Sequence, residues 1–252
     1  MVDLKHNIRL NYIPTLLVWS IFFSFYTIQA QPTKPLSFIQ VGLGAQQPFL
    51  DLAKDYGSNL NLNASVGLKW NKHWISGIGF EYLFGTTVKQ DVLYALRNDV
   101  GYVTNNEGYP ADVRITQRGF QVYFKWGYQG NLFSDHVFWV FTPAVTYLEH
   151  QVYLYDVEKK VVALQNESIK GYDRLCNGLG IRNEWGIMYL SKNRLSNFYI
   201  GFDATFAWTK NQRRFAYGIG ELPHSTRRDA LAGIRCSWIL PLYTSAEHSF
   251  YK

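Results

Sequence analysis

The most constraining feature of the chain is an alternation of apolar residues with small or polar residues, at a period of two, along most of its length after residue 31. In the segment 74–84, for example, Phe80 and Tyr82 alternate with Gly79 and Glu81. A period of two places successive side chains on opposite faces of a β-strand. About eight segments show this pattern, and they cover residues 39–44, 60–70, 74–84, 120–128, 137–155, 178–187, 198–208 and 232–242.

The connections between these segments alternate between short and long. The short ones are rich in turn residues and cover residues 71–73, 129–136 and 191–197, and the long ones cover about 46–58, 87–117, 156–172 and 209–227. This organisation is typical of an outer-membrane barrel, which has short periplasmic turns and long extracellular loops. The segment 137–155 is less regular than the others. Its Pro143 predicts a β-bulge, because proline lacks a donor for the ladder.

The two faces of the segments indicate which one meets lipid. Aromatic residues are as frequent as charged ones, at 17% each, and they gather at strand ends on the apolar face, as in the girdles of membrane barrels. The opposite face is mostly Gly, Ser, Thr and Asn, which suit a crowded lumen. We therefore predict an all-β fold, an antiparallel up-and-down transmembrane β-barrel of about eight strands over residues 31–243. The alternative is a soluble lipocalin-like binder, whose apolar face would line a cavity.

Residues 1–30 have the order of parts found in a secretory signal. Lys5 and Arg9 form a short positive region, an apolar stretch covers residues 13–26, and a small residue stands at the expected cut. We predict a cleavable signal peptide over residues 1–30, with an uncleaved signal anchor as the alternative. The mature chain is then expected in the cell outer membrane, with residues 244–252 as a short periplasmic tail.

The chain resembles the OmpA/OmpX-type small outer-membrane barrels in its signal, its number of strands and its alternation of loops. Residues 171–175, 177–179 and 238–243 are also similar to segments of uncharacterised outer-membrane barrel proteins of the Bacteroidota. The resemblance implies a monomeric barrel in contact with outer-membrane lipid. The chain departs from this type at its end. Small barrels of this kind usually end on an aromatic residue of the last strand, whereas here residues 244–252 follow Tyr243.

Six charged residues fall on the faces that are predicted to point into the barrel. They are the acids Glu81, Glu184 and Asp203 and the bases Lys125, Arg182 and Arg235. The interior of an eight-stranded barrel is just filled by side chains, so charges inside it must pair and form hydrogen bonds. We predict a structural ion network that plugs the lumen. A gated path for protons or ions is the alternative.

The long loops are expected to carry the contacts with other molecules. Their basic residues suit the phosphates of lipopolysaccharide, and the candidates are Lys210, Arg213, Arg214, Arg227 and Arg228. The alternative is that these basic residues form an ordinary solvated rim of the barrel and bind no lipid. The loop 87–117 is long and contains apolar residues, so we expect it to contact other outer-membrane proteins. The net charge is +6, but without a Lys/Arg run or a nucleic-acid motif we expect no nucleic-acid partner.

Signals for catalysis and for metal binding are weak in this chain. Cys176 and Cys236 are predicted on non-adjacent strands with opposite facing, so we expect free thiols, no metal site and no cofactor. A lipid-modifying outer-membrane enzyme would need His150 or His224 beside a serine at the outer rim. We predict a non-catalytic barrel with a plugged lumen, which is structural in the envelope or an accessory subunit of an outer-membrane secretion or surface-export assembly. The other alternative is a narrow ion or solute channel.

Overall fold

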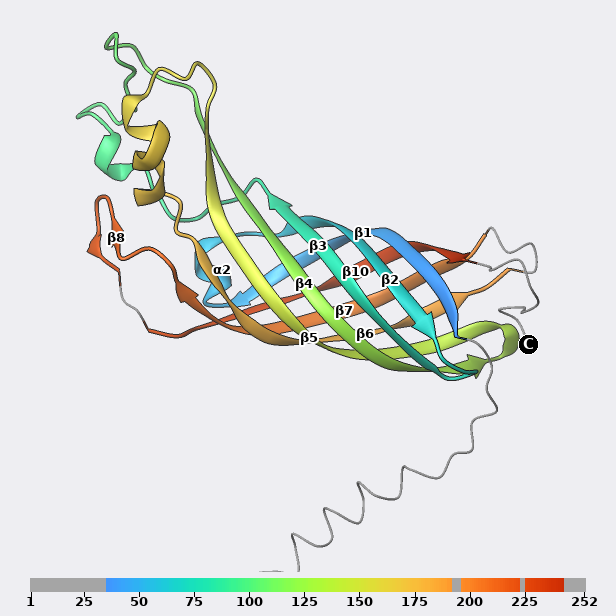
Figure 1. Ribbon diagram of the computed structural model, residues 1–252. Helices are drawn as coiled ribbons and strands as arrows, with labels where there is room; N and C mark the ends of the chain where they lie inside the picture. Colours follow the sequence, from blue (N-terminus) through green and yellow to red (C-terminus); the bar gives the residue numbers. More distant parts are fainter. Residues whose placement is uncertain (1–34, 192–195, 223–224, 243–252) are drawn as a thin grey trace, which may run out of the picture. The chain divides into compact units, whose positions relative to one another are not determined.

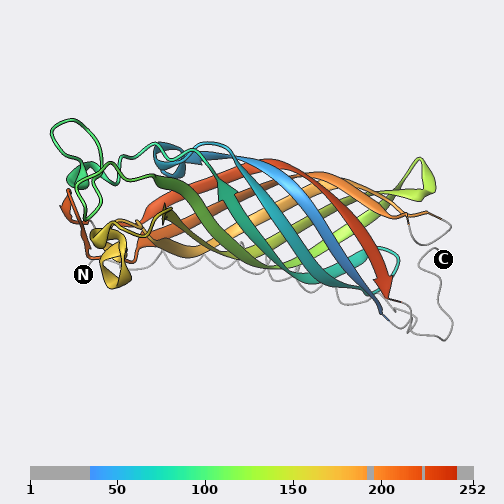
Figure 2. The same ribbon diagram turned by 90° about the horizontal axis from the view of Figure 1, so that it is seen from above.

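The structure is a computed structural model, which describes residues 35–191, 196–222 and 225–242. The predicted signal peptide and the predicted tail lie outside the described residues. Within them, eight long antiparallel strands form a closed barrel (Figures 1 and 2), which confirms the predicted fold. These strands are β1 (Leu36–Leu50), β2 (Asn59–Lys69), β3 (Trp74–Gly85), β4 (Val113–Leu132), β5 (Ser134–Asp156), β6 (Cys176–Tyr189), β7 (Phe198–Asn211) and β10 (Arg227–Leu242).

Each strand of the barrel pairs with the next barrel strand along the chain, and β10 closes the ring against β1. We call the end with short connections the turn end and the opposite end the loop end. The long connections carry the remaining elements, which are α2 (Leu52–Asp55), η1 (Tyr94–Leu96), η2 (Val162–Leu164), η3 (Asn166–Gly171), β8 (Phe215–Ala216) and β9 (Gly220–Glu221). In the described part of the chain, no helix has both the length and the apolar character needed to cross a membrane.

Strands β4 and β5 are longer than the sequence pattern predicts. They contain 20 and 23 residues, whereas their neighbours β3 and β6 contain 12 and 14. At the turn end, Phe133 alone separates them, so the predicted turn 129–136 is mostly strand. At the loop end they rise together beyond β3 (Figure 1). The two faces persist in this extension, because Val152 and Leu154 are buried in a cluster with loop residues whereas Tyr153 and Tyr155 are exposed.

The predicted β-bulge at Pro143 is absent. The ladder between β4 and β5 is interrupted opposite this proline, but it resumes in the same register, with Lys125 opposite Ala144 and Tyr128 opposite Phe141. The register with β6 is continuous across the same point. Proline removes one donor, and the pairs on both sides of it hold the two strands in place. The register shift of this hairpin lies next to the turn.

The outer wall of the barrel is apolar and the inner wall is polar. On β7, Phe198, Ile200 and Phe202 are exposed outside, whereas Asp203 and Thr205 are buried inside. Such a continuous apolar exterior needs an apolar surrounding, as lipid provides. This arrangement is the opposite of the one that the soluble lipocalin-like alternative requires.

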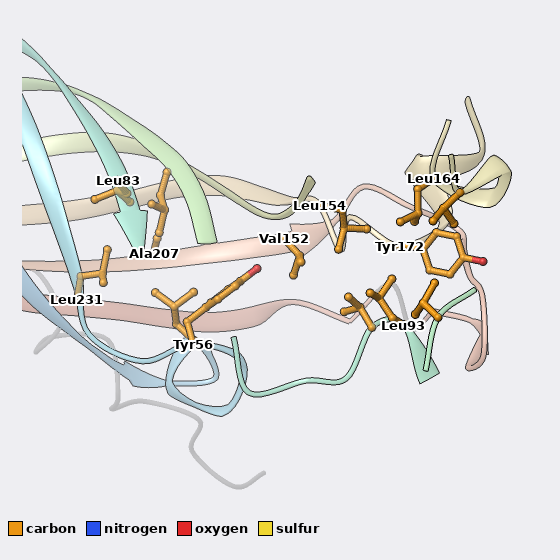
Figure 3. Close-up of a cluster of buried hydrophobic side chains, with 14 residues drawn as sticks. Tyr56, Leu83, Leu93, Val152, Leu154, Leu164, Tyr172, Ala207 and Leu231 are labelled. Atoms are coloured by element: carbon orange, nitrogen blue, oxygen red, sulfur yellow. The ribbon is translucent and has the colours of Figure 1, made fainter. Parts of the chain in front are cut away.

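Apolar side chains fill the interior near both ends. The turn-end cluster consists of Phe38, Ile75, Phe138, Val140, Met188, Leu190, Tyr199 and Ile239. The loop-end cluster joins barrel residues to loop residues and consists of Leu52, Tyr56, Leu83, Val92, Leu93, Val103, Leu148, Val152, Leu154, Val161, Leu164, Tyr172, Ala207 and Leu231. Figure 3 shows its side chains continuing from Leu83 and Leu231 in the barrel to Leu93 and Leu164 in the loops. Side chains of the long loops therefore pack against the interior of the barrel at this end.

Candidate functional site

The charged residues of the interior lie between the two apolar clusters. On β3, Glu81 follows Ile75 of the turn-end cluster and precedes Leu83 of the loop-end cluster. Asp203 on β7 and Arg235 on β10 occupy the same position between the clusters. The structure therefore places the charges at mid-height in a barrel that is apolar above and below them.

Glu81 joins side chains from four other strands, and on the neighbouring strand β4 its partner is Gln121, whose Nε2 lies 3.4 Å from Oε1. Oε2 of Glu81 accepts hydrogen bonds from Nη2 of Arg182 on β6 and from Nη2 of Arg235 on β10, at 2.9 Å in both cases. Its Oε1 accepts from Nε2 of Gln46 on β1 at 2.8 Å. The same amide nitrogen of Gln46 lies 2.7 Å from Oδ2 of Asp203. One carboxylate thus links opposite walls of the barrel.

Glu184 forms a second centre beside the first. Its Oε1 accepts from Nη1 of Arg235 at 2.9 Å and from Nε of Arg182 at 3.1 Å. Its Oε2 lies 3.4 Å from Nζ of Lys125. Arg182 also approaches Oδ2 of Asp203 at 3.0 Å. All six residues that the sequence placed inside the barrel therefore belong to one network of three acids and three bases.

The network is almost completely removed from water. Glu81 and Arg182 have no exposed surface. Removing charges from water is costly, and close pairing with hydrogen bonds offsets that cost. A space of about 20 Å³ remains beside Lys125 and Glu184, which is room for about one water molecule. The six charges therefore fill the middle of the lumen, and their net formal charge is zero.

Tyr123 lies among the three cations, and the sequence analysis did not single it out. Its ring centroid is 4.8 Å from Cζ of Arg182, 5.8 Å from Nζ of Lys125 and 5.9 Å from Cζ of Arg235. The face of an aromatic ring attracts cations. Gly79 on β3 provides the space, because a Cβ at that position would lie 2.2 Å from Cζ of Tyr123. A glycine on the inward face thus accommodates a large ring from the neighbouring strand.

A second buried polar cluster lies nearer the loop end, and the sequence analysis did not predict it. Nε2 of His150 is 2.9 Å from Oδ2 of Asp229, which also accepts a hydrogen bond from Thr209. Oδ1 of Asp229 accepts from Arg227 at 3.3 Å. His150 is 1% exposed and lies inside the barrel, not at the outer rim where the lipid-modifying alternative needs it. His224 lies outside the described residues.

The five cations that were predicted to contact lipopolysaccharide differ in their partners within this chain. Arg213 donates two hydrogen bonds to Asp173, with Nε at 2.9 Å from Oδ1, and these bonds raise the pKa of its guanidinium. Arg227 forms ion pairs with Asp55 and Asp229. Two of the five are therefore engaged by acids of this chain. The exposed members of the set are Lys210, Arg214 and Arg228.

Three long loops pack together into what we call the loop lobe, residues 86–112, 157–175 and 212–222. Nζ of Lys160 lies 3.1 Å from a carboxylate oxygen of Glu107. The loop lobe exposes many large apolar side chains, which are Tyr94, Val100, Tyr102, Tyr109, Val157, Val162, Phe215, Tyr217 and Ile219. The predicted partner loop 87–117 contributes part of this surface, and its last residues belong to β4.

The two cysteines are free and lie on opposite faces of non-adjacent strands, as predicted. Cys176 on β6 is buried, and Cys236 on β10 is exposed on the outer wall. Strand β7 lies between β6 and β10. The two thiols are therefore separated by the barrel wall.

The closed ring of eight strands, the apolar outer wall and the polar interior together define a membrane-spanning β-barrel. The solved structures that it resembles are also small barrels. They include Neisserial surface protein A (10% identity, 80% of this chain and 96% of that chain, TM-score 0.41). Another is the attachment invasion locus protein Ail of Yersinia pestis, in complex with the heparin analogue sucrose octasulfate (10% identity, 82% and 100%, TM-score 0.40).

A third is the N-terminal β-barrel domain of Pseudomonas aeruginosa OprF (8% identity, 81% of this chain and 97% of that chain, TM-score 0.39). At these identities and TM-scores the likenesses carry no information about function. Neither a protein-family model nor a curated protein matches the sequence.

Proposed function

We propose that the protein is an integral outer-membrane β-barrel with a plugged lumen and a non-catalytic role, which anchors the loop lobe at the cell surface. The single observation that carries this proposal is the balanced ion network enclosed between two apolar clusters. In this role the protein is a structural component of the envelope or an accessory subunit of an outer-membrane secretion or surface-export assembly.

The interior supports a plug better than a channel. An ion that crossed the barrel would have to pass the turn-end cluster, the ion network and the loop-end cluster in turn. Glu81 meets Arg182 and Arg235 at 2.9 Å, so the charges are engaged with one another. Moving any of them aside would leave a buried charge unpaired, which is strongly unfavourable.

The outer wall supports the orientation with the loop lobe outside the cell. Near the turn end, the outer wall carries a girdle of exposed aromatic residues, which are Trp70, Trp126, Trp139, Tyr189, Phe198 and Trp238. Aromatic rings of this kind sit at the level of lipid headgroups. Towards the loop end the first exposed charges on the outer wall are Lys210 and Arg228. Barrels of this kind have their short turns in the periplasm and their long loops outside.

The loop lobe supports a role in partner binding. It is held together by contacts between loops, and it exposes an unusual amount of apolar surface, such as Tyr94 at 74% and Ile219 at 63%. Large exposed apolar patches mark surfaces for other molecules.

The first experiment compares the electrophoretic mobility of the outer-membrane fraction in detergent, unheated and boiled. A folded membrane barrel resists cold detergent, so we expect a shift on boiling. Purified barrel is then added to a planar bilayer, where a plugged lumen gives no discrete conductance steps. Conductance steps that change when Glu81 is substituted would contradict the plugged lumen and favour the narrow channel. Recovery of the protein in the soluble periplasmic fraction without a shift would overturn the proposal altogether.

A further inference from the structure

Arg118 on β4 is a cation on the outer wall without an acidic partner. Its Nη1 donates a hydrogen bond to the hydroxyl of Tyr82 at 3.0 Å. Its Nε is buried and has no hydrogen-bond partner. In residues 35–191, 196–222 and 225–242, Arg118 forms no ion pair with a carboxylate. The outward carboxylate nearest to it in the register is that of Glu149, opposite Phe120 on β5, and it accepts hydrogen bonds from Tyr147 and Asn177 instead. An anion from another molecule would therefore stabilise this half-buried guanidinium.

Two tyrosines from the neighbouring strands hold this guanidinium. Its Cζ lies 5.2 Å from the ring centroid of Tyr153 on β5 and 5.9 Å from that of Tyr82 on β3. An arginine has five N–H donors in a rigid plane, and in the described part of the chain only the bond to Tyr82 uses one. The side chain is therefore oriented by its surroundings. Nε is covered, so the donors left for an outside anion are those of the two terminal nitrogens that the bond to Tyr82 does not use.

Arg118 stands where the apolar outer wall ends. Phe120, Val122 and Phe124 separate it from Trp126 of the aromatic girdle on the same face of β4. Eight residues of a strand tilted by about 40° span about 20 Å along the barrel axis, which is close to the height of the apolar band of a membrane barrel. Arg118 is therefore at the level of the lipid headgroups on the loop side.

The same face continues beyond Arg118 with further suitable side chains. Arg114 lies four residues away on β4, opposite Tyr155 on β5. Asp112 approaches Arg114 only at 3.8 Å, and both side chains are well exposed. Tyr153 and Tyr155 present 42% and 46% of their surface. We call these outward residues, Arg118, Arg114, Tyr82, Tyr153 and Tyr155, the Arg118 strip.

We propose that the Arg118 strip binds a phosphate group of an outer-leaflet lipid. The planar fork of arginine matches a phosphate with two parallel hydrogen bonds, and the low dielectric at the membrane boundary strengthens the pairing. The tyrosine rings provide faces on which the sugar of a phosphorylated glycolipid packs. The placement beside the outer leaflet rests on the proposed function. A free phosphate has the same chemistry, so the experiment separates the two sources.

The test uses the folded full-length barrel in a zwitterionic detergent, with binding read by native mass spectrometry. The probes are a lipid A that carries its phosphates, the same lipid A without phosphates, and inorganic phosphate. The variants are Arg118→Gln, and Arg118→Lys, which keeps the charge but loses the fork. The matched control is Arg97→Gln, an exposed arginine of the loop lobe that pairs with Asp91 and lies outside both the Arg118 strip and the set predicted to contact lipopolysaccharide.

We expect Arg118→Gln to weaken binding of phosphorylated lipid A by about tenfold or more, which is the effect of losing one charge-assisted pair. Arg118→Lys should bind with an affinity between those of Arg118→Gln and the unaltered barrel. Arg97→Gln should bind like the unaltered barrel. Phosphate-free lipid A should bind weakly to all of them.

Three results would overturn the inference: equal binding by the Arg118→Gln barrel, equal binding of phosphate-free lipid A, or displacement of the lipid by inorganic phosphate at the same concentration. The last result would assign the site to free phosphate. Each variant is first checked for the mobility shift on boiling, so that only folded barrels are compared. A barrel that sits in the outer membrane but fails this test refutes the lipid site alone and leaves the proposed function standing.

Discussion

The carboxylate of Glu81 and the guanidinium of Arg182 meet at 2.9 Å, although their strands, β3 and β6, are separated by β4 and β5. Their contact therefore crosses the lumen. Neighbouring strands of a barrel are held by backbone hydrogen bonds, but only side chains can join strands that are not neighbours. The ion network thus links strands across the interior of the closed ring.

The first prediction concerns Glu81→Gln. The substitution leaves the shape of the side chain nearly unchanged and leaves Arg182 and Arg235 with one carboxylate fewer. Breaking a buried ion pair by removing one partner costs about 3–5 kcal/mol, so we expect the free energy of unfolding to fall by an amount of that order. Urea unfolding of the barrel in lipid vesicles, followed by tryptophan fluorescence, measures it.

The matched control for this variant is Glu107→Gln in the loop lobe. Glu107 pairs with Lys160 at 3.1 Å, but both side chains are about half exposed. Exposed pairs contribute about 0–1 kcal/mol, so this variant should unfold almost like the unaltered barrel. An unaltered barrel that conducts ions, together with a Glu81→Gln barrel that is equally stable but has a changed conductance, would contradict the plug and favour the channel.

The second prediction concerns the pair of Gly79 and Tyr123. A Cβ at position 79 would overlap the Tyr123 ring, and overpacking costs about 1–3 kcal/mol. Gly79→Ala should therefore destabilise the barrel. In a barrel that already carries Tyr123→Leu, the same Gly79→Ala change should cost much less, because the smaller side chain leaves room.

A double-mutant cycle of these two substitutions measures the coupling by urea unfolding. If the free-energy costs of the two substitutions simply add, the position of the Tyr123 ring does not depend on Gly79. The packing argument for Tyr123 would then be wrong.

The position of the ion network was predictable because a β-strand has a fixed period. Once Phe80 and Tyr82 are assigned to the lipid face, Glu81 between them must point inward. The same argument placed Asp203 and Arg235 inside. No knowledge of the barrel's curvature was needed for this step, since the two faces of a strand are defined by the strand itself.

The partners of these side chains were not predictable from the alternation. Gln46 meets Glu81 because of the tilt and stagger of the strands, which depend on the whole ring. His150 and Asp229 are 79 residues apart, so no local spacing reveals their contact. The loop lobe lacks periodicity altogether. The β-bulge predicted at Pro143 was wrong, because the loss of one hydrogen-bond donor does not shift the register of a ladder that the neighbouring residue pairs hold in place.

The third prediction concerns the reactivity of the two thiols. Cys236 faces outward and Cys176 is buried. A lipid-soluble maleimide should therefore label the folded barrel once, at Cys236, and should label Cys176 only after unfolding. Mass spectrometry of the labelled chain counts the adducts, and the Cys236→Ala variant is the control. Rapid labelling of Cys176 in the folded barrel would show that the loop end is open to reagents.

The last prediction concerns the ion pair that joins two loops of the loop lobe. Arg213 follows β7 and Asp173 precedes β6, and their two hydrogen bonds are partly shielded from water. Loss of about 1–2 kcal/mol raises the population of an open state by a factor of about 5–30. Cleavage that requires local opening follows this population. Chymotrypsin should therefore cut the loop lobe of Arg213→Ala several-fold faster, while the mobility shift of the barrel on boiling stays unchanged.

Two further variants decide whether the pair itself is responsible. Asp173→Asn removes the other partner and should accelerate cleavage to a similar extent, whereas Arg214→Ala removes an exposed neighbour and should have little effect. Equal acceleration by Arg214→Ala would show that cleavage responds to the charge of this loop in general. Unchanged cleavage in Arg213→Ala and in Asp173→Asn would mean that the apolar contacts of the lobe, such as Tyr172 against Tyr217 with ring centroids 4.8 Å apart, suffice to keep it closed.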